Sequence, residues 1–498
     1  MSRNDRLLVI DEGTTGTRAL VFDGAARRLA ARYREFTQYH PAPDRVEHDA
    51  EEIWQATLEQ ARAALSESGT RAGELAAVGI TNQRGTSLLW DRETGEAVTR
   101  AIVWQDLRTA GLAAELAPEW GKRVQMHTGW TLAPVYSCLS LHWLLEQDPA
   151  LRRRAEAGEL AFGTIDSWLV HKLSGGAAHV ISASNAVVTG CYDLLADDWY
   201  GEWIEALGIP RGVLPRVVDD SGVIATTDAG VFGAEVPIGA AVADQSAALF
   251  GQGCLSPGEG KTTHGTGTFL DLNTGSTPVI SAHGLSTIIA WRREGETTYG
   301  LEGYAPVTGS AVQWLRDGAE LLRTADETQE LAESVPDNGG VYFVPALTGL
   351  AAPSWDSTAR GLLIGISPGT TRGHLARAAL EGIVYSIKDF VDLMAAEYGQ
   401  SITSLRADGG ASANNFLLQF QADMIGATIH RPADVEATSI GAAYLAGLAV
   451  EVWKTPEDCF RDVADDAVFI PGMDPARRDA LYAQWGHAVE RARGWVRT

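Results

Sequence analysis

Two aspartates stand at the ends of apolar runs, and each is followed by residues that could serve a phosphorylated ligand. Asp11 ends the run at residues 7–10 and precedes a turn rich in glycine and threonine, in LLVIDEGTTGTRALVFD. Asp244 ends a second run, in PIGAAVADQSAALFGQG. Small residues let a polyphosphate approach backbone N–H groups, and Mg²⁺ is typically held by one or two carboxylates plus substrate phosphates. The first stretch fits either a phosphate site or an ordinary β-hairpin.

Two later stretches have the same character. KTTHGTGTFLDL repeats the design of a polar strand, a turn of glycine and threonine, and an apolar strand. In SLRADGGASANNFLLQFQADMIG a strand ends at Asp408, a Gly-Gly turn follows, and Asn414 stands near the start of an apolar helix, where it could equally be a helix cap. The chain contains neither GxxxxGK[ST] nor a GxGxxG that opens a helix in a βαβ unit. If the protein binds ATP, it must therefore use Gly-Thr hairpins and a Gly-Gly turn.

The elements that would position these residues alternate between helix and strand. Hydrophobic periodicity predicts helices at 49–65 and 374–396, a strand at 74–83, and a strand that breaks into a helix across 237–253. One strand–turn–strand unit falls in each half of the chain. This predicts an α/β protein of two related domains, 1–252 and 253–498, divided where glycine and proline cluster.

Composition excludes several classes of function. The 498 residues carry a net charge of −24, which argues against non-specific binding to nucleic acid or anionic membranes. No apolar run reaches the length of a transmembrane helix, and the N-terminus has no signal-peptide pattern. The four cysteines form no CxxC pair, and their wide spacing indicates buried thiols in a reducing compartment. We therefore expect a cytoplasmic protein with no nucleic-acid partner and no integral membrane segment.

At this point the chain resembles the actin, sugar-kinase and chaperone ATPases, more narrowly the FGGY carbohydrate kinases, and within them the glycerol kinases. GLLIGISPGTTRGHLARAALE, residues 361–381, matches the C-terminal signature of the FGGY family. Eight further stretches follow in the family's order: TNQR, AIVWQD, FGTIDSWL, DQSAALFGQ, GTGTF, VPALTGLAAPSWD, DGGASANNFLLQFQ and GAAYLAGLAV.

The resemblance implies a fold, a reaction and a set of ligands. The fold would be two actin-like (ribonuclease H-like) α/β domains with the active-site cleft between them. The reaction would transfer the γ-phosphate of ATP, with Mg²⁺, to a terminal hydroxyl of glycerol or a similar polyol. A homo-oligomer, either a dimer or a tetramer, is also implied. A nucleotide-dependent assembly protein of the actin or chaperone type is disfavoured, because such a switch needs no polyol pocket.

The same resemblance assigns individual residues. Positions that match nucleotide contacts of the family are Thr14, Thr15, Arg18, Gly265, Thr266, Gly309, Gln313, Gly410 and Asn414, and those near the metal are Asp11 and Asp244. Positions that match polyol contacts are Arg84, Trp104, Asp244, Gln245 and Phe269. Asp244 is the candidate catalytic base, because loose phosphoryl transfer requires only that a carboxylate orient the hydroxyl and take its proton late. The alternative is an aspartate that caps a helix.

The polyol pocket departs from the family at two positions. Gly85 stands where the glycerol kinases have glutamate, and Val135 where they have tyrosine, with Tyr136 one position later. Losing the glutamate removes an acceptor for substrate hydroxyls and should open space. WQDLR, residues 104–108, also fits a pattern of the ketose kinases. Two interpretations therefore stay open: glycerol, with Tyr136 and a water compensating, or a four- or five-carbon polyol or ketose.

Overall fold

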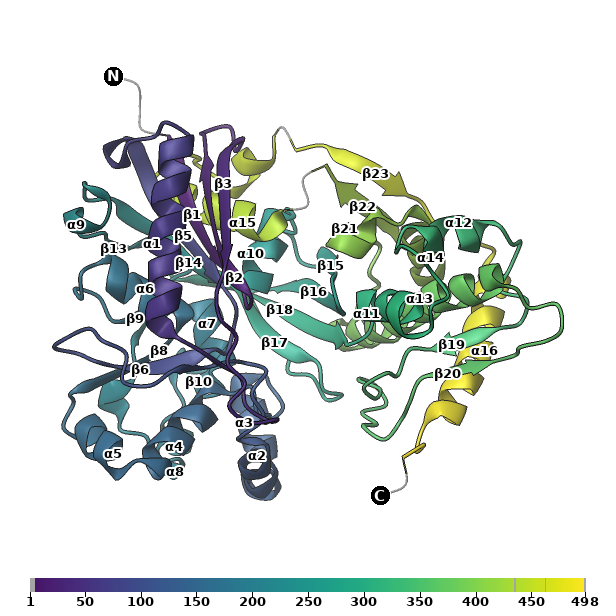
Figure 1. The fold of residues 1–498 in the computed structure, drawn as a ribbon, viewed down its shortest axis with the longest axis horizontal. Helices are drawn as coiled ribbons and strands as arrows, with labels where there is room; N and C mark the ends of the chain where they lie inside the picture. The colour runs from purple at the N-terminus through teal and green to yellow at the C-terminus, as the bar shows by residue number, and fades with distance from the viewer. Residues whose placement is uncertain (1–4, 434–435, 462, 497–498) are drawn as a thin grey trace.

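The first half of the chain forms a twisted mixed sheet. The computed structural model describes residues 5–433, 436–461 and 463–496. The sheet has the order β13-β14-β5-β1-β2-β3 (Figure 1), in which β1 pairs with β2 and β2 with β3 antiparallel, while β1, β5 and β14 run parallel. Its strands are β1 (Arg6–Glu12), β2 (Gly16–Phe22), β3 (Arg28–Glu35), β5 (Leu75–Asn82), β13 (Ser221–Thr226) and β14 (Pro237–Ala243). The predicted hairpin at Asp11 is thus β1–β2.

The second half repeats this arrangement. The order β18-β16-β15-β21-β22 has the same pattern of antiparallel and parallel neighbours as β3-β2-β1-β5-β14. The strands are β15 (Gly260–His264), β16 (Thr268–Gly275), β17 (Ser286–Arg293), β18 (Glu296–Ala305), β21 (Ser404–Asp408), β22 (Thr428–Pro432) and β23 (Asp465–Phe469). A bridge between Ser221 of β13 and Arg293 of β17 joins the strands of the two halves into one 13-stranded sheet. Two related α/β domains, as predicted, follow from this shared topology.

Helices cover both sheets. Asp49 caps α1 by accepting from the backbone N–H groups of Glu51 and Glu52, and α1 lies along β2 and β3. Helices in the first half are α1 (Ala50–Glu67), α6 (Ile165–Leu173), α7 (Ala183–Val188), α9 (Ala229–Phe232) and α10 (Asp244–Gly251). Those in the second half are α11 (Gly309–Gln313), α12 (Glu327–Glu333), α13 (Arg372–Tyr398), α14 (Asn415–Ile425), α15 (Ala437–Ala449) and α16 (Pro475–Ala492). In the described part of the chain no helix is both long and apolar enough to cross a membrane.

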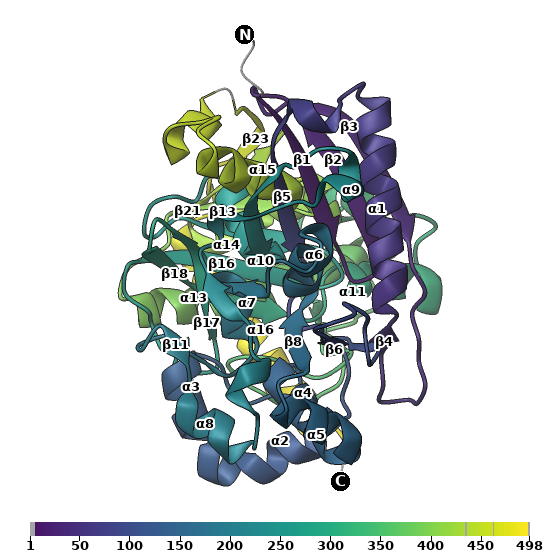
Figure 2. The ribbon, with the colours of Figure 1, turned by 90° about the vertical axis from the view of Figure 1, so that its left-hand side faces the viewer.

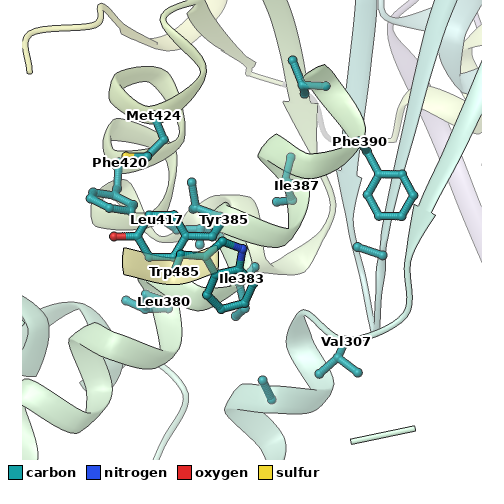
Figure 3. Packing of buried hydrophobic residues seen from close by; sticks show 14 of the residues in the cluster. Val307, Leu380, Ile383, Tyr385, Ile387, Phe390, Leu417, Phe420, Met424 and Trp485 are labelled. Carbon is teal, nitrogen blue, oxygen red and sulfur yellow. The ribbon is translucent and has the colours of Figure 1, made fainter. Parts of the chain in front are cut away.

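The core of the second half is packed around α13. Figure 3 shows its buried side chains meeting those of α14 and α16. The ring of Tyr385 lies 5.3 Å from Trp485 and 5.6 Å from Phe420, centroid to centroid. Beside this core runs the short ladder of β19 (Tyr342–Val344) and β20 (Leu362–Ile364). The core holds β16 and β18, which with β15 supply much of the site described below.

A lobe inserted in the first half lies at the bottom of the molecule in Figures 1 and 2. Its small sheet has the order β4-β7-β6-β8. The strands of the lobe and its surroundings are β4 (Glu47–His48), β6 (Ser87–Asp91), β7 (Ala101–Ile102), β8 (Leu160–Thr164), β9 (Val180–Ser182), β10 (Tyr192–Asp193), β11 (Asp198–Trp199) and β12 (Arg216–Val218). The helices are α2 (Ala110–Leu116), α3 (Lys122–Thr128), α4 (Ser137–Gln147), α5 (Pro149–Glu156) and α8 (Gly201–Ala206).

Two helices cross in close contact where the halves meet. Although α15 belongs to the second half in sequence, it packs against β1, β5 and β14 of the first half, and against α10 (Figure 1). The contact depends on glycine, because a Cβ at Gly441 would lie 1.9 Å from the carbonyl oxygen of Ala247, and one at Gly251 would lie 2.1 Å from that of Ala437. The crossing thus fixes α10, whose first residue is Asp244, against α15. The division at 252 and 253 stays a prediction.

Candidate active site

Asp244 lies at the junction of β14 and α10, and its carboxylate is paired with Arg84. The Arg84 Nε lies 3.2 Å from Oδ1 of Asp244, and the Asp244 side chain keeps 33% of its surface exposed. Ala243, rather than Asp244, occupies the N-cap position of α10. Removal from water raises the pKa of the Asp244 carboxyl above its ordinary value, while the charges of Arg84 and Lys261 act in the opposite direction. The carboxylate is therefore accessible and held in one orientation, as a base must be.

Arg84 pairs with a second carboxylate, and two aromatic rings lie close to its guanidinium. Its Nη1 lies 2.8 Å from Oε2 of Glu302, and its guanidinium carbon lies 5.8 Å from the ring centre of Phe269 and 5.9 Å from that of Trp130. Burial raises the pKa of Glu302 to about 7, against the opposing charge of Arg84. The predicted residues Arg84, Asp244 and Phe269 are thus brought together. Glu302 and Trp130 join them, although neither is among the predicted contacts.

Gln245 is held from behind by a buried lysine. The Lys261 Nζ donates to Oε1 of Gln245 at 2.8 Å and to Oγ1 of Thr263 at 2.9 Å. It also pairs with Asp271 at 2.7 Å, and both charged side chains are fully buried. Because an ammonium group is only a donor, it fixes the amide of Gln245 with its oxygen toward Lys261. The amide NH₂ is then left as a donor.

Asp11 is a partly buried carboxylate near the same aspartate. Its Oδ2 accepts from Oγ of Ser439 at 2.6 Å, a contact between β1 and α15. Burial, with a smaller contribution from the neighbouring charge of Asp244, raises the pKa of Asp11 to about 6, although the Ser439 hydrogen bond and the charge of Arg18 act in the opposite direction. A divalent cation bound between two carboxylates that repel each other would neutralise their charges. The pair therefore fits the predicted metal position.

The second Gly-Thr turn and the Gly-Gly turn line one cavity. Its volume is about 580 Å³, and the predicted nucleotide residues on its wall are Gly265, Thr266, Gly309, Gln313, Gly410 and Asn414. A Cβ at Gly410 would meet no atom within 4 Å, so the backbone there is open to a ligand. Asn414 also caps α14 by accepting from the N–H of Leu417, so its two interpretations are compatible.

The first Gly-Thr turn lies outside this cavity. The Thr14 hydroxyl accepts from Nε1 of Trp104 at 3.0 Å, which links the turn to a predicted polyol contact. Thr15 is exposed, with its hydroxyl 3.4 Å from that of Tyr33. Arg18 forms an ion pair with Glu436. The hydrogen bonds to Asp11 and Thr14 thus join this turn to α15 on one side and to the polyol region on the other.

The space expected beside Gly85 is filled. Gly85 has a φ of +75°, and a Cβ there would lie 3.1 Å from the carbonyl oxygen and 3.2 Å from Cγ2 of Val135. The left-handed backbone favours glycine whatever the substrate. The prediction that this glycine opens space is therefore corrected, since Val135 closes it.

The structure also corrects the prediction for Tyr136. Its side chain is fully buried in a hydrophobic cluster with Cys138, Leu139 and Trp203. At Gly190, a Cβ would lie 2.0 Å from the Tyr136 ring, which shows how tightly that ring is enclosed. Successive residues at the start of α4 point in different directions, so moving one position from Val135 directs the side chain into the core.

The ketose-like pattern in WQDLR is also explained by local structure. Arg108 pairs with Asp106 at 2.8 Å and Glu47 at 2.7 Å, and its side chain keeps only 4% of its surface exposed. Its guanidinium also lies over the ring of Trp143. Asp106 accepts from the backbone N–H of Val46. These contacts hold the loop after β7 in place, and Trp104 in the same stretch stays 37% exposed.

Comparisons with known proteins agree with this geometry. Residues 6–251 match the profile of the FGGY family of carbohydrate kinases, N-terminal domain, and residues 260–450 match that of the C-terminal domain. The chain belongs to the FGGY family of carbohydrate kinases. It is 51% identical to a glycerol kinase of Dechloromonas aromatica over 99% of both chains, and 46% identical to glycerol kinase 2 of Thermotoga maritima over 98% of this chain and 99% of that protein.

Solved structures show the same fold. The crystal structure of Plasmodium falciparum glycerol kinase with ADP superposes with a TM-score of 0.94, at 31% identity and 99% coverage of both chains. A ligand-bound xylulose kinase from Lactobacillus acidophilus superposes with a TM-score of 0.87 at 20% identity, over 98% of this chain and 97% of that one. The latter likeness concerns the fold alone. Together they confirm the predicted two-domain actin-like architecture.

Proposed function

We propose that this carbohydrate kinase transfers the γ-phosphate of ATP to a terminal hydroxyl of glycerol, with Mg²⁺ as the metal. The observation that carries the proposal is the pairing of Arg84 with the accessible carboxylate of Asp244, 3.2 Å apart. Relatives named glycerol kinase, at 45–51% identity over nearly the whole chain, support glycerol as the acceptor. Val135 closes the space that a longer substrate would use beside Gly85, which also favours a three-carbon substrate.

Each predicted residue then has a role. Asp244 accepts the proton of the attacking hydroxyl as the new O–P bond forms and the bond from the γ-phosphorus to the leaving ADP oxygen breaks. Arg84, Trp104, Gln245 and Phe269 orient the polyol. Gly265, Thr266, Gly309 and Gln313 lie along the phosphates, with Gly410 and Asn414 at the adenosine, while Thr14, Thr15 and Arg18 approach the phosphates from the other side. Asp11 and Asp244 would hold Mg²⁺, which supplies charge neutralisation to the phosphates.

The proposal is tested by the specificity constants of purified enzyme for polyols of three to six carbons and for ketoses, measured by coupled release of ADP. We expect the specificity constant for glycerol to exceed that for every four- and five-carbon candidate by at least roughly ten-fold, because one misfitting pocket contact supplies that much discrimination. A four- or five-carbon polyol or ketose with the highest constant would replace glycerol as the substrate. Background ADP release with every acceptor would contradict the kinase proposal itself. The oligomeric state and the cytoplasmic location stay predictions.

Gly85→Ala is expected to raise the KM for glycerol by roughly ten-fold, because the added methyl would press on the Val135 wall of the pocket. The matched control is Gly295→Ala, which has nearly the same φ, +76° against +75°, but no atom within 4 Å of an added Cβ. Both changes should cost about 1–2 kcal/mol of stability through the left-handed backbone. Steady-state kinetics and thermal unfolding separate the two effects. An unchanged glycerol KM in Gly85→Ala would remove Val135 from the pocket wall.

A further inference from the structure

Three charged side chains stand in one row beneath the candidate polyol site. Lys261, Asp271 and Glu302 lie on the neighbouring strands β15, β16 and β18, where Lys261 is directly opposite Asp271 and Asp271 directly opposite Glu302. Residues directly opposite on adjacent strands point to the same face, so the register alone brings the three together. Lys261 and Asp271 are fully buried, and Glu302 keeps 6% of its surface exposed.

Each end of this row contacts a residue that we assign to substrate binding. At one end Glu302 is 2.8 Å from Arg84, and at the other end Lys261 donates to Gln245 at 2.8 Å. Asp271 stands between them and pairs with Lys261 at 2.7 Å. We propose that this buried row, with Glu302 as its principal member, positions Arg84 and Gln245 for the polyol. The inference rests on the proposed function, because it concerns the polyol site of that reaction.

The charges explain why Glu302 should affect substrate binding rather than only the fold. The guanidinium of Arg84 is shared between Glu302 and Asp244, at 2.8 Å and 3.2 Å. Two carboxylates on different elements fix the plane of a guanidinium more tightly than one can. Without the charge of Glu302, Arg84 keeps Asp244 as its ion-pair partner and would move toward that base. The polyol would then lose an oriented donor, and Asp244 would become a poorer acceptor of the hydroxyl proton.

A buried charge also has a cost that the row must offset. Buried ion pairs are frequently no more stabilising than apolar residues of the same volume, so stability alone gives little reason for them. The row contacts Arg84 and Gln245, both adjacent to Asp244 or paired with it, which is where a positioning function would require charges. If the row were only structural, its loss would lower stability and leave the KM for the polyol unchanged. This difference allows a direct test.

The test compares Glu302→Gln with Glu381→Gln. Glu381 is a matched control, because it is equally buried at 3% exposure and pairs with Arg377 at 2.8 Å, but it lies on α13 away from Arg84. Glutamine keeps the shape of the side chain but removes the charge that pairs with Arg84, so we expect Glu302→Gln to raise the KM for glycerol by about ten- to hundred-fold and to lower kcat. The KM for ATP should stay within about two-fold, because the nucleotide cavity is untouched. Glu381→Gln should lower the thermal midpoint while leaving the glycerol KM unchanged.

The outcomes separate this inference from the proposed function. If the wild type fails to phosphorylate glycerol, the proposed function is wrong, and the variants are compared with the best acceptor of the polyol screen instead. If the wild type is active, a folded Glu302→Gln variant with unchanged polyol KM overturns the inference alone, as does an equal rise in the KM for ATP. Should Glu302→Gln not fold, Glu302→Asp keeps the charge with a shorter reach. Its polyol KM is expected to rise without a change for ATP, and an unchanged polyol KM would again contradict the inference.

Discussion

The Asp244→Asn variant is expected to lose about 10²–10⁴-fold of its turnover, the range typical of general acid–base catalysis, while binding ATP as the wild type does. The amide cannot take the hydroxyl proton, and it also loses the ion pair that Asp244 makes with Arg84 at 3.2 Å. The turns that line the nucleotide cavity are not altered by this change. Steady-state turnover and calorimetric titration with ATP measure the two effects separately.

Asp49→Asn is the control for Asp244→Asn. Asp49 caps α1 through its side chain, and asparagine is as good a cap as aspartate, so neither turnover nor stability should change. If Asp244→Asn kept the turnover of the wild type and bound ATP normally, Asp244 would not be the base. A fall in ATP affinity equal to the fall in turnover would show that Asp244 acts only through the metal and the nucleotide, and not as the base.

Gly441→Ala is expected to destabilise the protein by about 1–3 kcal/mol or more, as overpacking of a close contact does. A Cβ there would lie 1.9 Å from the carbonyl oxygen of Ala247, so α15 and α10 must move apart. Because α10 begins at Asp244 and α15 carries the Ser439 that binds Asp11, turnover should fall with stability. Thermal unfolding and steady-state kinetics of the same preparation provide the two readings.

Replacing Gly486 by alanine should have the opposite effect on stability. Gly486 lies within α16, and an added Cβ would meet no atom within 4 Å. Alanine is the better helix former by about 0.8–1 kcal/mol, so Gly486→Ala should raise the thermal midpoint slightly and leave turnover unchanged. A Gly441→Ala variant as stable and as active as the wild type would show that the helix crossing is not the close contact described here.

Local sequence patterns predicted the elements that carry Asp11 and Asp244. A buried strand that ends on a carboxylate, followed by glycine and threonine, depends on neighbouring residues alone, so the β1–β2 and β15–β16 hairpins could be predicted. So could the strand–helix junction at Asp244. The order of the strands in the sheets is a non-local property, and the resemblance to the FGGY family supplied what periodicity could not.

Contacts between distant segments could not be predicted from local patterns. Lys261, Asp271 and Glu302 are about 10 to 40 positions apart along the chain, and only the register of three strands aligns them. Their one signal in the sequence is a charge in the middle of an otherwise buried strand, as in FLDLN and YGLEG. Tyr136 was assigned wrongly for a related reason, because a shift of one residue changes the direction of a side chain. The positive φ of Gly85 likewise appears only in the folded backbone.

We propose that Asp244 lies where the γ-phosphate of ATP is transferred to glycerol. Phosphorus NMR of the products, recorded for the wild type and Asp244→Asn in parallel, tests it most directly. We expect the wild type with ATP, Mg²⁺ and glycerol to form a phosphomonoester on a terminal carbon in step with ADP, and the variant to form almost none in the same time. ADP accompanied only by inorganic phosphate, or the same ester at the same rate from the variant, would contradict the account.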